Sequence, residues 1–180
     1  MAVDGRVCGW ADGDPLPAEL LLAKAMVFDP HGLPAGIPVP EPESAAYGAH
    51  MLTVKGRAVR FRVAGTTPTK SGQFVTLWQR STAGPIRPFD LSDGVDLFVV
   101  GVRDGAQRGQ FVFPVAALAR RGVVSRGGAG GKRAMRVYAP WVAVTSAQAA
   151  RTQAWQREFF LPLDGNLPLD AARVYELYAA

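Results

Sequence analysis

Short apolar runs separated by glycine-containing turns fill the chain from residue 51 to residue 138, and this pattern constrains the fold most strongly. The segment MLTVKGRAVRFRV predicts a β-hairpin, because Lys55-Gly56 lies at its centre and glycine tolerates the positive φ of a tight turn. In its second strand Arg60 and Arg62 alternate with apolar residues, so we expect both on the face opposite Val59, Phe61 and Val63. Further strands are predicted at QFVTLWQR, VDLFVVGVR, GQFVF and KRAMRVY.

Helical patterns flank these strands. In DPLPAELLLAKAMVFDPHG, Asp14 is expected to cap a helix that Asp29-Pro30 ends. Other helices are predicted at PVAALARRG, at SAQAARTQAWQREFF with a Ser146 or Thr145 cap, and after Pro168. The fold class is therefore α+β, with a curved, mainly antiparallel sheet or partial barrel flanked by helices.

The segment HGLPAGIPVPEPES is dense in proline and predicts an extended connection. We place a boundary here, with an N-terminal helix and proline-rich arm over residues 1–46 and the α+β body over residues 47–180. At 180 residues both parts fit one compact domain.

Several classes of site are not expected. The single cysteine, Cys8, excludes an intramolecular disulfide and a cysteine-rich zinc site. His31 and His50 lie in or beside the proline-rich segment without a third ligand, so no metal-histidine site is expected. No metal and no cofactor are predicted. No apolar run approaches the roughly 20 residues that cross a bilayer, and the first residues lack a secretory pattern. We therefore expect a cytoplasmic protein without membrane association.

Positive charge is concentrated in the middle of the chain. Residues 1–50 hold 2 basic and 7 acidic residues, whereas residues 51–160 hold 17 basic and 5 acidic residues, a net charge of +12. Fourteen of those 17 are arginine, which pairs with phosphate and with guanine edges. This favours a nucleic-acid partner; the alternative is a solvated basic surface whose arginines reflect a GC-rich genome.

Two segments carry residue types that suit phosphate. The loop TTPTKSG offers Thr67, Thr69 and Lys70, although ordinary polar turns favour the same residues. The segment GGAGGKRAMRVYAPW places Lys132, Arg136 and Tyr138 on one strand face and Arg133 on the other. A basic strand face that ends in aromatic residues suits a nucleic-acid groove, and the alternative is an edge strand protected by charge.

The letters GQFV occur twice, at residues 72–75 and 109–112, but their flanking residues differ. A repeat would extend over the whole period, so we interpret the match as a shared local need for a turn glycine before a strand. No Gly-x-x-x-x-Gly-Lys-Ser/Thr pattern is present, which argues against a P-loop.

No complete catalytic motif is visible. Asp90, Asp93 and Asp96 offer oxygen ligands for magnesium, but Pro68 and Gly130 stand where a restriction-type nuclease needs an acid two positions before its lysine. We interpret Asp90 and Asp93 as a solvated turn and Asp96 as a strand-start residue. In the helix ARTQAWQREFF, Trp155 and Phe159 are expected in the core. Arg151, Gln153 and Gln156 are expected to point outward, either at a ligand or as part of a solvated helix face.

The segments TPTKSGQFVTLWQR, PIRPFD, GQFVFP, GKRAMRVYAPW and ARTQAWQREFF, in this order, resemble the MepB family. The resemblance runs from about residue 47 to residue 160. It implies a bacterial protein of a family named for a multidrug-efflux locus, with a fold likened to DNA-binding or restriction-endonuclease-related domains. The chain departs from the family pattern at Gly65, where members usually have a lysine, so one basic contact is in doubt.

From these observations we predict a nucleic-acid-binding protein with duplex DNA as its partner. The predicted contact residues are Arg60, Arg62, Thr67, Thr69, Lys70, Arg80, Lys132, Arg133, Arg136 and Tyr138. Two alternatives stay open at this point: a metal-dependent nuclease-like enzyme and a small-molecule-binding protein.

Overall fold

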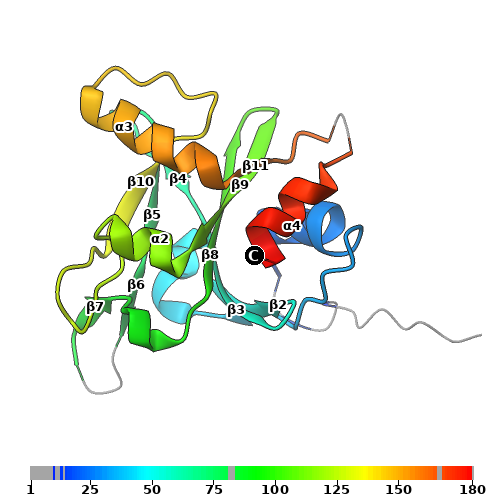
Figure 1. Cartoon of the computed structure of the whole chain (residues 1–180), viewed down its shortest axis with the longest axis horizontal. Helices are drawn as coiled ribbons and strands as arrows, with labels where there is room; N and C mark the ends of the chain where they lie inside the picture. The colour runs from blue at the N-terminus through cyan, green and yellow to red at the C-terminus, as the bar shows by residue number, and fades with distance from the viewer. Residues whose placement is uncertain (1–9, 11–12, 14, 81–83, 166–167, 180) are drawn as a thin grey trace, which may run out of the picture.

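A six-stranded sheet forms the centre of the computed structural model, with helices on both of its faces (Figure 1). The structure describes residues 10, 13, 15–80, 84–165 and 168–179. The strand order is β1-β2-β3-β8-β9-β11, and every neighbouring pair is antiparallel except the parallel pair β3–β8. The strands are β1 (Val39–Pro40), β2 (His50–Val54), β3 (Arg57–Val63), β8 (Leu97–Asp104), β9 (Gln107–Pro114) and β11 (Phe160–Pro162).

The predicted hairpin is confirmed. Strands β2 and β3 pair in register from His50–Phe61 to Val54–Arg57, and Lys55 and Gly56 at the turn both have positive φ, 50° and 74°. Positive φ at both central positions is the requirement of a tight hairpin whose twist matches its strands. Strand β8 is buried from Leu97 to Val102 between β3 and β9, as its nearly continuous apolar run predicted.

Two smaller sheets lie beside the large one. One has the order β10-β5-β4, formed by β10 (Ala134–Val137), β5 (Gln73–Thr76) and β4 (Gly65–Thr66). The other pairs β6 (Trp78–Arg80) with β7 (Ile86–Pro88). The prediction of one strand over QFVTLWQR was therefore wrong: the chain leaves one sheet and enters another at Leu77, which is buried and donates its backbone N–H to the Arg133 carbonyl.

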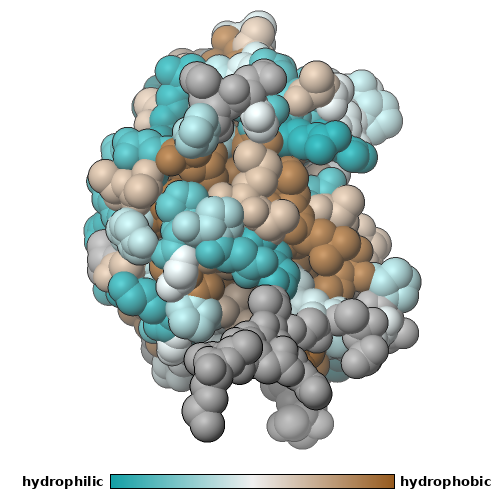
Figure 2. All heavy atoms as spheres, turned by 90° about the vertical axis from the view of Figure 1, so that its right-hand side faces the viewer, coloured by the Kyte–Doolittle hydropathy of each residue, from teal (hydrophilic) through white to brown (hydrophobic). Residues whose placement is uncertain are grey.

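One face of the large sheet is covered by helices over residues 18–28 and 171–179. Helix α1 (Ala18–Ala23) continues directly into the π-helix η1 (Lys24–Phe28), and α4 (Ala171–Ala179) packs beside them. Their apolar side chains share one core with those of β2, β3, β8 and β9. The helix ends at Asp29 as predicted, whereas the predicted Asp14 cap lies outside the described residues and Pro17 is the N-cap residue. Figure 2 shows this face as hydrophobic residues scattered between hydrophilic ones.

The opposite face is covered by α2 (Val115–Arg120), α3 (Ala147–Gln156) and the small sheet β10-β5-β4. Ser146 caps α3, since its Oγ accepts a hydrogen bond from the backbone N–H of Ala149 at 3.1 Å. The helix predicted up to Phe160 instead passes through the 3-10 turn η4 (Arg157–Phe159) into β11. Two further 3-10 segments are η2 (Pro42–Tyr47) and η3 (Leu91–Asp93).

The α+β class is confirmed: the sheets are mainly antiparallel, they carry helices, and they do not close into a barrel. Helix α1 shares its core with β3 and β8, so the described part of the N-terminal arm is packed onto the body. In the described residues, no helix is long and apolar enough to cross a membrane.

Candidate functional site

A groove of about 700 Å³ lies between β10, α3 and the loop that precedes β5. Strand β10 and helix α3 lie next to each other at one side of the molecule (Figure 1). The lining residues are Thr69, Lys70, Ser71, Arg121, Val123, Lys132, Ala134, Met135, Arg136, Tyr138, Thr145, Ser146, Gln148, Ala149, Thr152, Trp155 and Gln156. The two segments that the sequence singled out thus meet in one groove.

Four cationic side chains converge on the groove from separate parts of the chain. Lys70 comes from the loop before β5, Arg121 from the end of α2, and Lys132 and Arg136 from β10 and the residues that lead into it. No aspartate or glutamate is among the lining residues in the described part of the chain. The groove is therefore a concentration of positive charge without local compensation, which attracts anions.

Arg136 is held in place by the loop that forms the opposite wall. Its Nη2 donates to Thr67 Oγ1 at 2.7 Å and its Nη1 donates to the Ser71 carbonyl at 3.3 Å, while its guanidinium lies 6.0 Å from the Phe74 ring centre. Thr67, predicted as a direct contact, is thus placed to orient Arg136. These contacts fix the loop relative to β10 before any ligand arrives.

Arg121 and Trp155 form a cation–π contact at another part of the lining. The Arg121 guanidinium lies 5.1 Å from the centre of the Trp155 ring, and the arginine side chain is exposed. Behind it, the Trp155 ring packs against Phe113 and Phe159, with ring centres 5.5 Å and 6.4 Å apart. Trp155 is half-buried and packs against the core, as the prediction required in part, and its ring also contacts an exposed cation in the groove.

The glutamines of α3 attach this helix to the edge of β10. Gln156 Nε2 donates to the Arg136 carbonyl at 2.9 Å, and its Oε1 accepts from the Tyr138 backbone N–H at 2.8 Å. Gln153 Nε2 donates to the carbonyl groups of Ala139 and Val142. Both glutamines are buried, so the prediction that they point outward was wrong: each side chain hydrogen-bonds to backbone groups that the small sheet leaves unpaired.

The predicted contact residues fall into separate places. Those that line the groove are Thr69, Lys70, Lys132, Arg136 and Tyr138. Arg133 is exposed but is not part of the lining, in agreement with its predicted place on the other strand face. The sequence analysis did not select Arg121. Two arginines in a row end this short helix, and the local sequence does not indicate which of them lies in the groove.

Arg60, Arg62 and Arg80 line a different hollow of about 250 Å³, next to the proline-rich arm. Arg62 is only 1 % exposed; its Nη1 donates to Glu41 Oε2 at 2.5 Å and to the Phe61 carbonyl at 2.9 Å. Glu41 Oε1 also accepts from Arg60 at 3.2 Å. Burial lowers the pKa of Arg62, and the Glu41 carboxylate opposes that shift. Arg62 therefore stabilises the contact between β3 and the proline-rich arm, and its burial does not support direct contact with a ligand.

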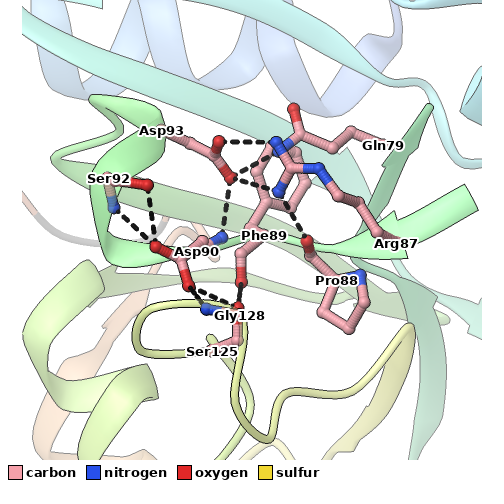
Figure 3. Close-up of polar contacts among 9 residues, drawn as sticks. All are labelled: Gln79, Arg87, Pro88, Phe89, Asp90, Ser92, Asp93, Ser125 and Gly128. Carbon is pink, nitrogen blue, oxygen red and sulfur yellow. Dashed lines mark hydrogen bonds and ion pairs between the residues drawn. The ribbon is translucent and has the colours of Figure 1, made fainter. Parts of the chain in front are cut away.

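Asp90 organises the loop after β7 rather than standing in solvent (Figure 3). It is 6 % exposed, and its carboxylate accepts hydrogen bonds from the Gly128 and Ser92 backbone N–H groups and from the Ser125 and Ser92 hydroxyls. These bonds lower the pKa of Asp90 well below its usual range. The interpretation of Asp90 as part of a solvated turn was therefore wrong.

Asp93 completes this network (Figure 3). Arg87 donates to both of its oxygens, at 2.7 Å and 3.0 Å, and Gln79 Nε2 and the Asp90 backbone N–H add further donors. Burial alone raises the pKa of Asp93, but these donors outweigh burial and lower it. Asp96 accepts from the Ala58 N–H and is the strand-start residue that we expected. Within the described ranges, no three histidine, cysteine or acidic residues are grouped as metal ligands.

The family model for MepB-like proteins matches residues 41–162, a range that contains every element of the groove. The chain belongs to the MepB-like family. A solved structure described as the crystal structure of MepB is similar to this chain with 27 % sequence identity and a TM-score of 0.71, covering 85 % of this chain and 99 % of the other. No curated protein matches the chain. The MepB resemblance seen in the sequence is thus confirmed, and α1 and α4 lie outside the residues that the family model matches.

Proposed function

We propose that this MepB-like protein binds nucleic acid, with the sugar-phosphate backbone in the groove between β10, α3 and the loop at residues 69–71. The observation that carries the proposal is the convergence of Lys70, Arg121, Lys132 and Arg136 on a groove without a carboxylate among its described lining residues. Neutralising phosphates with such cations releases condensed counterions, which supplies most of the affinity of sequence-independent binding.

The cations and the hydroxyl groups of the lining can bind phosphate in different ways. Lys70 and Lys132 are exposed and have no ion-pair partner in the described part of the chain, so both are available to phosphate. Arg136 is oriented by the loop and can present its guanidinium without further ordering. Hydroxyl groups, which often hydrogen-bond to phosphate oxygens, surround these cations at Thr69, Ser71, Thr145, Ser146 and Thr152.

The two alternatives have less support. A metal-dependent nuclease would use Asp90, Asp93 or Asp96 as metal ligands. The carboxylates of all three accept hydrogen bonds from neighbouring protein groups, and none of the three lines the groove. A small-molecule site is typically lined by mostly apolar side chains, whereas most side chains of this groove are polar or charged.

The proposal is tested by removing charge from the groove and measuring fluorescence anisotropy with labelled DNA at low ionic strength. The variant Lys70→Ala/Lys132→Ala/Arg136→Ala should bind at least about tenfold more weakly, because each charge-assisted hydrogen bond contributes about 1.5–3 kcal/mol. A matched control removes three cations that lie beside α1 or α4, by Lys55→Ala/Arg103→Ala/Arg108→Ala.

The control variant should keep its affinity to within about twofold, since distant charges are screened by salt. Equal losses in both variants would mean that only net charge matters and would remove the groove from the proposal. Unchanged binding in the groove variant, or no binding by the unmodified protein, would refute it.

A further inference from the structure

We infer that the groove takes an unpaired strand, so that its preferred ligand is single-stranded nucleic acid rather than the duplex that the sequence suggested. The inference rests on the proposed function and concerns the form of nucleic acid that this site selects. Three features of the groove support it: its size, the flat groups in its lining, and their mixture with cations.

The first feature is size. A volume of about 700 Å³ lies within the range of about 300–1,000 Å³ that cavities for a single small ligand occupy. Strand β10, helix α3 and the loop at residues 69–71 all contribute to its lining. A groove of this volume accommodates a short segment of one strand.

The second feature is the planar guanidinium of Arg121, which lies over the ring of Trp155. Trp155 is packed against Phe113 and Phe159, which leaves its ring little freedom, and Arg121 covers it as an exposed planar cation. Bases that are free of a duplex stack on guanidinium planes and aromatic rings. A paired base presents only its edge, so this platform would gain nothing from a duplex.

Tyr138 adds a second ring to the same lining. Its ring packs so closely on Gly72 that a Cβ at that position would lie 2.6 Å from Tyr138 Cδ1. The Tyr138 backbone N–H is held by Gln156, so ring and backbone are both fixed. The groove therefore offers two flat groups, Tyr138 directly after β10 and Arg121 directly after α2, the latter lying over Trp155 of α3.

The third feature is that cations and flat groups line one surface. Lys70, Lys132 and Arg136 suit phosphates, while the Arg121–Trp155 pair and Tyr138 suit bases. A single strand can present its phosphates and its bases to one groove at once, and proteins that bind single strands combine these two kinds of contact.

The test compares a labelled single strand of mixed sequence with the same strand annealed to its complement, by fluorescence anisotropy at one salt concentration. We expect the single strand to bind at least about tenfold more tightly, since each stacked base contributes about 1–3 kcal/mol. The variant Arg121→Lys keeps the charge but loses the planar group, and should weaken single-strand binding about fivefold while leaving duplex binding unchanged. Its matched control is Arg120→Lys, an exposed neighbour on the same helix that does not line the groove.

The outcomes separate the inference from the proposed function. If neither form of DNA binds, the proposed function fails. If the duplex binds as tightly as the single strand, or more tightly, the inference fails and the proposed function stands. If Arg121→Lys matches Arg120→Lys, or weakens both forms of DNA equally, the stacking role is overturned and the inference with it.

Discussion

At the scale of single residues, the ion pair between Arg62 of β3 and Glu41 attaches the proline-rich arm to the large sheet. Arg62 is almost fully buried, and its Nε and Nη2 have no hydrogen-bond partner among the described residues. Its charge is offset by Glu41, by the Phe61 carbonyl and by the Phe89 ring, whose centre lies 6.0 Å from the guanidinium carbon. A buried charge without its partner is strongly destabilising, so Glu41 is the residue on which this contact depends.

We therefore predict that Glu41→Gln lowers the free energy of unfolding by about 3 kcal/mol or more, because it leaves the buried Arg62 charge uncompensated. Urea unfolding followed by circular dichroism measures the change. The matched control is Glu176→Gln, which breaks the exposed pair of Glu176 with Arg173 and should cost less than about 1 kcal/mol. Equal effects of the two substitutions would contradict the assignment of Arg62 as a buried cation.

At the scale of elements, the loop before β5 and strand β10 form one unit. Arg136 reaches from β10 to the loop, and the Tyr138 ring lies on Gly72. Gly72 has a φ of +72°, and Gly109 approaches the Phe160 ring so closely that a Cβ would lie 2.3 Å from it. The interpretation of a shared turn glycine before a strand was therefore wrong: Gly72 precedes β5 at positive φ, whereas Gly109 lies inside β9 against Phe160.

This predicts that Gly72→Ala both destabilises the protein and weakens nucleic-acid binding. The positive φ costs about 1–2 kcal/mol for an L-residue, and the clash with Tyr138 adds to this cost by displacing the loop from β10. Thermal unfolding and anisotropy measure the two effects. Gly105→Ala is the control: its φ is +57° with open space around the Cβ, so it should show the backbone cost alone and bind normally. Normal binding by Gly72→Ala would contradict the coupling of loop and groove.

At the scale of the whole molecule, local patterns predicted the elements but not all of the contacts between them. The hairpin at Lys55-Gly56, the buried run of β8 and the Ser146 cap follow from turn chemistry and periodicity, and all are present. The break at Leu77 could not be predicted, because it depends on which sheet each half of QFVTLWQR joins.

The residues of the candidate groove were also predicted only in part. Lys70, Lys132, Arg136 and Tyr138 were selected from loop chemistry and strand alternation, which are local properties of the sequence, and the structure brings them into one groove. The burial of Gln156 and the place of Arg121 depend on how α2 and α3 pack over β10, which no local pattern specifies. Positive charge alone did not predict which arginines are accessible to a ligand. Arg62 and Arg136 both alternate with apolar residues in a strand, but in the fold Arg62 is buried and Arg136 lines the groove.

The most direct test of the groove as a phosphate-binding surface is the salt dependence of binding to a labelled single strand. Four cations in contact with phosphates predict that log K falls with log salt with a slope of about −3. The variant Lys70→Ala/Lys132→Ala/Arg136→Ala retains only Arg121 of the four, and its slope should be about −1. A slope near zero for the unmodified protein, or the same slope for the variant, would contradict nucleic-acid binding through this groove.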